Sequence, residues 1–333
     1  MLPDQPDSRP AGRTDIAAPK RSSGGWARWL RVGLGFGIIA LLLTQIDLEA
    51  ALRAVVEARV ELLLLGFAIV LGSRLLAGVR WYVLLRGRHA AVTLPGLLRL
   101  MFVADFVGYF MPGSLGVEVL RVYGMAKATA DPALSATSVV VERVVALIVL
   151  VLLVLVGLAG RPLALPPEIG RLAWLFLAAL LVGVLAIMAR PTRSLALRLL
   201  PGERLTRIRR GLERVFAALD SYRAQPWLIA ASFLLALIFQ LMRCASVTVS
   251  AAALHHPLPF TFVLVVYPIM LLISLLPITI AGLGVREAGF VYFLGLGGMP
   301  AEVALPLALI QRLFTIIATL PGAWWYVRRG MHD

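Results

Sequence analysis

Two stretches of the sequence combine a broken backbone with charged side chains. One runs from Pro277 to Gly289 and ends in the string Gly-Leu-Gly-Val-Arg-Glu-Ala-Gly. The other runs from Phe110 to Arg121 and has the same order of a proline, then glycines, then charged residues. Both lie between apolar runs, and hydrocarbon satisfies neither free backbone groups nor charges. At membrane depth such stretches therefore indicate packing against protein or the wall of a wet cavity.

The chemistry that these residues favour is the binding of an anion. A helix that starts after each break presents unpaired N–H groups, and its dipole attracts negative charge. Arginine suits a phosphate geometrically, and the neighbouring glutamates would orient the arginines or carry a proton. The alternative is that the glycines only allow close helix packing. The predicted substrate-binding residues are Pro112, Gly113, Ser114, Gly116, Glu118, Arg121, Arg143, Gly282, Gly284, Arg286, Glu287 and Arg312.

Arg143 and Arg312 each lie several residues inside an apolar run. Such an arginine either snorkels, forms a structural ion pair, or faces the protein interior. We favour the inward-facing position for both. Arg74 and Arg243 are weaker candidates of the same kind.

The composition is that of a polytopic membrane protein. Of 333 residues, 60% are hydrophobic and only 15% are charged, and the mean hydropathy is +0.89, far above that of a soluble domain. The net charge of +14 lies largely in short segments between apolar runs, which is the positive-inside pattern and not a nucleic-acid surface. One cysteine and four scattered histidines predict no metal site, and we find no catalytic set and no cofactor motif.

Six apolar runs are predicted to cross the membrane fully. Residues 1–28, rich in Pro, Ser, Gly and charge, are expected to form a disordered cytoplasmic tail. Basic clusters such as Arg80, Arg86 and Arg88 mark the cytoplasmic ends of spans. The predicted spans are about 29–46, 62–81, 134–158, 172–189, 227–252 and 303–327.

The segment about 190–225 fixes the topology. It carries nine arginines between 190 and 223 and should stay cytoplasmic, together with both termini. Counting spans from it, the stretches 93–129 and 260–298 must each enter and leave on one face, as re-entrant helical hairpins. The fold is thus predicted to be all-α, with six spans and two hairpins inside a membrane domain at 29–327. Eight plain transmembrane helices remain the alternative.

An internal repeat relates the two halves of the chain. One alignment of the halves matches Gly116-Val117 with Gly284-Val285. A second alignment, shifted by a single position, matches Glu142-Arg143 with Gln311-Arg312 and Arg74 with Arg243. Repeat 1 covers about 62–158 and repeat 2 about 227–327, and the predicted topology gives them opposite orientations. This inverted-repeat plan is typical of secondary transporters.

The same motifs resemble a known family, the flippase-like proteins named after the transmembrane domain of lysylphosphatidylglycerol synthase. The resemblance covers about residues 29–327 and implies lipid handling in a bacterial inner membrane, with phospholipid, polyprenyl-phosphate or hopanoid pathways as its setting. Since six residues follow Val327, we expect no soluble aminoacyl-transferase domain. The motifs concerned are 112–116 with Glu118 and Arg121, then Glu142-Arg143, then 276–287.

Three functions are compatible with these features. The first is translocation of an anionic lipid, with its phosphate bound by arginines at the broken-helix tips. The second is an integral-membrane enzyme acting on a lipid phosphate, which the lack of a catalytic motif disfavours. The third is an accessory partner of a lipid-biosynthesis enzyme.

Overall fold

A computed structural model describes residues 25–44, 46–88, 90–109, 116–129, 131–159, 224–274 and 283–329, with isolated positions between 174 and 222. All regular secondary structure within these residues is helical, as expected. The helices are α1 (Gly25–Thr44), α2 (Leu48–Val56), α3 (Val60–Arg86), α4 (Leu94–Tyr109), α5 (Gly116–Thr129), α6 (Pro132–Ala159), α10 (Pro226–Ala253), α11 (Phe260–Ser274), α12 (Val285–Gly295) and α13 (Ala301–Arg329).

Four of these helices, α3, α6, α10 and α13, are long and apolar enough to cross a membrane. They confirm a multi-pass membrane protein and coincide with four of the six predicted spans. The first predicted span, 29–46, largely overlaps α1, which begins at Gly25, slightly before the expected end of the tail, and ends at Thr44. The tail before Gly25, and nearly all of the predicted span 172–189 and of the basic segment 190–225, lie outside the described residues.

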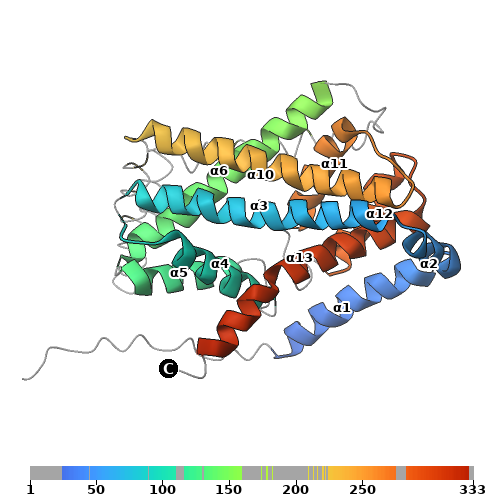
Figure 1. Ribbon diagram of the computed structural model, residues 1–333, viewed down its shortest axis with the longest axis horizontal. Coiled ribbons are helices and arrows are strands. Elements are labelled where there is room, and N and C mark those ends of the chain that lie inside the picture. Colours follow the sequence, from blue (N-terminus) through green and yellow to red (C-terminus); the bar gives the residue numbers. More distant parts are fainter. Residues whose placement is uncertain are drawn as a thin grey trace, which may run out of the picture.

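Helices α3 and α10 pack side by side and run antiparallel through the middle of the molecule (Figure 1). At one end the Arg59 amide donates to the Ala253 carbonyl at 2.9 Å. At the other end the Tyr222 hydroxyl donates to the Leu84 carbonyl at 3.1 Å. The backbones approach closely at Gly66, where a Cβ would lie 2.7 Å from a serine hydroxyl on α10. This pair is the axis of the fold.

Two pairs of short helices flank this axis. Helix α4 packs on α5, and α11 packs on α12. Figure 1 places the two pairs at opposite ends of α3 and α10. The long helix α6 contacts α5 and α11, while α13 contacts α12 and α4. Each half therefore has the order long, short, short, long, and the last long helix of each half also packs on the first short helix of the other.

Local signals explain where the long helices begin. The Asp131 carboxylate accepts a hydrogen bond from the Leu134 amide at 2.9 Å, so it caps α6 directly before Pro132. Helix α10 likewise starts at Pro226, whose missing N–H costs nothing in the first turn. Proline at the first position and an acidic cap are the expected start of a helix.

Most of the apolar core forms two clusters. One surrounds α10 to α13, extends onto α6, and includes the fully buried Phe262 and Phe290. A second lies beneath α4 and α5 and is centred on Trp81 and Met125. Helices α4 and α5 therefore pack on a cluster separate from the one around α11 and α12.

Candidate functional site

A cavity of about 220 Å³ is lined by α10, α11, α12 and α13 of the second half and by one residue of α3 from the first half. Three arginines line it, Arg74 from α3, Arg243 from α10 and Arg286 from α12. Among the described lining residues there is no carboxylate. The cavity is therefore positively charged and suited to an anion.

The side chain of Arg243 is held in place, but not all of its hydrogen-bond donors have an acceptor in the described structure. Its side chain is buried, and its Nε donates to the Tyr267 hydroxyl at 3.1 Å. Its Nη1 has no hydrogen-bond partner in the described structure, and neither has the buried amide nitrogen Nε2 of Gln240, three residues earlier on the same helix. A buried polar group without a partner costs about 1–3 kcal/mol, and more when charged. An anion in the cavity would remove this cost.

The other two arginines have different surroundings. Arg74 Nη1 is paired with Asp105 Oδ2 of α4 at 2.8 Å, and its side chain stays partly exposed. The Arg286 guanidinium lies 5.7 Å from the centre of the Phe290 ring, within the range of a cation–π contact. The Asp105 carboxylate thus balances the charge of Arg74.

Beside the cavity, the Glu287 side chain caps the first turn of α12. Its Oε2 accepts a hydrogen bond from the Gly284 amide at 2.8 Å, and its Oε1 accepts one from Arg312 Nε at 2.5 Å. Gly284 has φ of 80° and ψ of −51°, which only glycine adopts readily. The amide that we expected to bind an anion at this helix end is thus already donated to Glu287.

The first half contains a larger ionic network. The Glu142 carboxylate pairs with Arg80 through one oxygen and with Arg121 through the other. The Arg121 guanidinium also lies 4.2 Å from the Trp81 ring centre, and the Trp81 indole donates to Ser138 at 3.0 Å. All five side chains are buried. The network fastens α5 to α3 and α6.

One ion pair occurs in both halves. Glu118 of α5 pairs with Arg143 of α6, and Glu287 of α12 pairs with Arg312 of α13. Glu118 precedes Glu287 by the same number of positions as Arg143 precedes Arg312. Arg312 is buried as expected, whereas the Arg143 side chain is 49% exposed.

The structure divides the predicted site residues into separate groups. Arg286 lines the cavity, while Glu118, Arg121, Arg143, Glu287 and Arg312 belong to the ion pairs described above. We expected Glu118 and Glu287 to orient Arg121 and Arg286, but the structure pairs Glu118 with Arg143, Glu287 with Arg312, and Arg121 with Glu142. Gly116 is buried at the start of α5 and Gly284 caps α12. Pro112, Gly113, Ser114 and Gly282 lie outside the described residues.

Sequence reasoning missed several polar residues. Arg80 was interpreted as a cytoplasmic flank, but it is buried, because Glu142 on another helix supplies its counter-charge. Gln240 and Tyr267 were not singled out. A glutamine three residues before an arginine in an apolar run was the available signal, since such polar residues in a membrane helix usually face the bundle interior.

The comparisons with known proteins agree with this picture. A family model described as the lysylphosphatidylglycerol synthase TM region matches residues 28–322, nearly the whole chain. No curated protein and no solved structure matches the chain.

Proposed function

Because the chain belongs to the family described as the lysylphosphatidylglycerol synthase TM region, we propose that it moves an anionic lipid between the leaflets of the bacterial inner membrane. The lipid is a phospholipid or a polyprenyl phosphate. The observation that carries this proposal is the cavity lined by Arg74, Arg243 and Arg286. Its charge and the unpaired donors of Arg243 and Gln240 match a phosphate, which accepts several charge-assisted hydrogen bonds.

The arrangement of the helices supports alternating access to this cavity. Arg74 and Arg243 correspond in the internal repeat, lie on antiparallel helices, and line the same cavity. The alignment that matches these two arginines also matches the first residue of α5 with the first residue of α12. It matches the first residue of α6 with the first residue of α13 in the same way. An inverted repeat whose halves meet at a central binding site is the plan of many secondary transporters.

The short helices support re-entrant hairpins. Helices α4, α5, α11 and α12 have 16, 14, 15 and 11 residues, whereas crossing the hydrocarbon takes about 20 residues. The two pairs lie at opposite ends of the axis formed by α3 and α10 (Figure 1). In the proposed topology one hairpin thus opens toward the cytoplasm and the other toward the outside, with both termini cytoplasmic.

In this mechanism the phosphate alone enters the protein. Arg243 and Arg286 bind it, while the acyl or prenyl chains stay in the bilayer. The ion pairs Glu118–Arg143 and Glu287–Arg312 fasten each hairpin to the long helix that follows it and set the position of its tip. The chain itself performs no covalent chemistry in this cycle.

The test is lipid translocation by the purified protein in liposomes, with fluorescent head-group-labelled phosphatidylglycerol and phosphatidylcholine. We expect the wild type to move phosphatidylglycerol faster. Replacing Arg243 or Arg286 with glutamine should slow this movement about tenfold or more, the equivalent of one lost charge-assisted contact of about 1.4 kcal/mol. R243K should retain part of the rate, and R53Q on the distant α2 is the matched control.

Two results would count against the proposal. Wild-type rates in both R243Q and R286Q would exclude the cavity as the phosphate site. If the wild type moved neither labelled phosphatidylglycerol nor a labelled polyprenyl phosphate, with or without a proton gradient, lipid translocation itself would be excluded for these substrates.

A further inference from the structure

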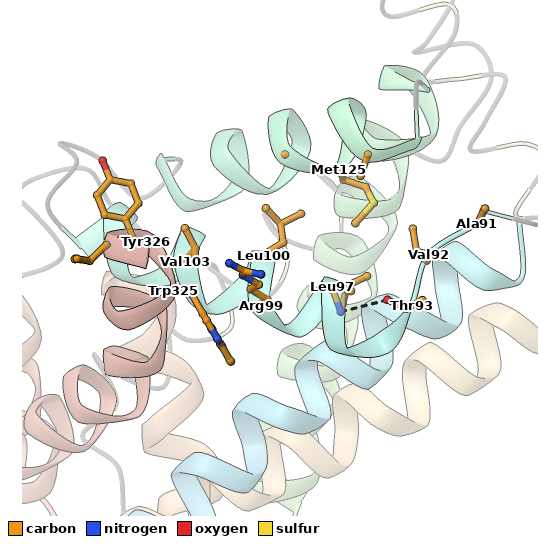
Figure 2. Close-up of a pocket in the computed structure, with 14 residues that line it drawn as sticks. Ala91, Val92, Thr93, Leu97, Arg99, Leu100, Val103, Met125, Trp325 and Tyr326 are labelled. Carbon is orange, nitrogen blue, oxygen red and sulfur yellow. Dashed lines mark hydrogen bonds between the residues drawn. The ribbon is translucent and has the colours of Figure 1, made fainter. Parts of the chain in front are cut away.

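A second, larger hollow lies at the end of the molecule where α4 begins and α5 and α13 end. It has a volume of about 850 Å³ and shares no lining residue with the arginine cavity. Figure 2 shows its walls: Leu97 and Leu100 rise from α4, Met125 lies across from them on α5, and Trp325 closes one end. We call this hollow the α4 groove.

The α4 groove is mostly apolar and carries a charge at one place. Arg99 supplies the only charge among its described lining residues, and Figure 2 shows its guanidinium between Leu100 and Trp325. The Nε of Arg99 is buried and has no hydrogen-bond partner in the part of the chain that the structure describes. Directly after the lining residue Val327, Arg328 stacks on the Trp324 ring at 4.4 Å, which adds a second cation at this end.

This combination matches one class of ligand. A long apolar wall takes a hydrocarbon chain, an unsatisfied guanidinium takes a phosphate, and a Trp at the mouth is typical of the boundary between hydrocarbon and head groups. The volume lies in the range of about 300–1,000 Å³ that is usual for small-molecule sites. A lipid without a phosphate would leave Arg99 Nε unsatisfied, whereas a lipid with a phosphate would satisfy it.

We propose that the α4 groove is a second binding site for a phosphate-bearing membrane lipid, with one hydrocarbon chain along α4 and the phosphate on Arg99. The choice of an anionic lipid rests on the proposed function, but the site is separate from the arginine cavity. Helix α4 connects the two sites: Asp105, which pairs with the cavity residue Arg74, lies six residues after Arg99, or about 9 Å along the helix axis. The groove thus holds the lipid beside the hairpin that it must pass.

The experiment uses the fluorescence of Trp325 in the full chain reconstituted into nanodiscs. Brominated phosphatidylglycerol, or brominated diacylglycerol, which has the same chains but no phosphate, is added at rising mole fraction, and the difference between wild type and W325F isolates the quenching of Trp325. We expect half-maximal quenching at a mole fraction about tenfold lower for phosphatidylglycerol, which is the selectivity of one charge-assisted contact.

Three variants test which feature produces this selectivity. R99Q should remove the tenfold preference, and R99K should retain part of it. A128F, which fills the groove from an exposed lining position, should reduce quenching by both lipids. R86Q is the matched control, because Arg86 is an exposed arginine on α3 that does not line the α4 groove.

The outcomes separate this inference from the proposed function. Equal quenching by the two lipids, or an unchanged preference in R99Q, would overturn the α4 groove as a phosphate-lipid site even if translocation is intact. Selective quenching that R99Q abolishes, in a protein that moves no lipid, would support the groove and exclude the proposed function. R243Q should slow translocation about tenfold or more while leaving the quenching unchanged.

Discussion

Replacing Glu142 with glutamine removes the one carboxylate that two buried arginines share. Arg80 and Arg121 are 7% and 6% exposed, and each donates to a different oxygen of Glu142. Glutamine keeps one acceptor oxygen but loses the charge. A hydrogen bond to a charged group contributes about 1.5–3 kcal/mol, and removing one partner of a buried ion pair costs about 3–5 kcal/mol. We therefore expect E142Q to lower the free energy of unfolding by about 3–5 kcal/mol.

The assay is reversible unfolding of the purified protein in mixed micelles by titration with a denaturing detergent, followed by circular dichroism. The matched control is E49Q, which makes the same chemical change at a carboxylate that is 80% exposed and paired with Arg53. An exposed pair of this kind is worth about 0.3–0.5 kcal/mol. The double variant E142Q/R80M should recover part of the loss, because it removes one of the two uncompensated cations.

The reasoning would be refuted if E142Q were no less stable than E49Q. It would also fail if E142Q/R80M were less stable than E142Q alone, because Arg80 would then stabilise the fold without its carboxylate. Either result would mean that apolar packing around Trp81, and not the shared charge, holds α5 in place.

Two further predictions concern glycines and use thermal unfolding in detergent as the measurement. G284A should cost about 1–3 kcal/mol, because φ of 80° strains any residue with a Cβ, whereas G289A, inside the helix that Gly284 caps, should be tolerated, since its nearest neighbour would lie 4.0 Å away; equal stability of the two would contradict the described turn. G322A should cost about 1–3 kcal/mol, because its Cβ would meet the Phe102 carbonyl of α4 at 2.0 Å. G37A, with nothing within 4 Å, is the control, and an equally mild effect at 322 would contradict the contact between α13 and α4.

The long helices were predictable from the sequence, while their ionic partners were not. Length and composition of an apolar run are enough to predict α3, α6, α10 and α13. The partner of a charge within such a run depends on which helices touch. Arg80 and Glu142 are 62 residues apart, so nothing local indicated that they pair.

A shift by a single position in the alignment of the internal repeat changes which residues are matched, and therefore which ion pairs are predicted. The alignment that matches Gly116 with Gly284 places Glu118 opposite Arg286. The alignment shifted by that one position matches Glu118 with Glu287 and Arg143 with Arg312, and these are the pairs that form. The sequence predicted the right types of residue near the proposed hairpins, but the register of the alignment between the two halves decides which of them form ion pairs.

The antiparallel packing of α3 on α10 has a consequence for biosynthesis. A ribosome finishes α3 at Arg86 and reaches the start of α10 only at Pro226, on the order of ten seconds later at about 5–20 residues per second. During that interval the close-packing surface at Gly66 has no α10 to cover it, and the fully buried Val70 has no α13 to pack against. The first half must therefore wait in the bilayer in an incomplete state, and it matures only when its counterpart is inserted.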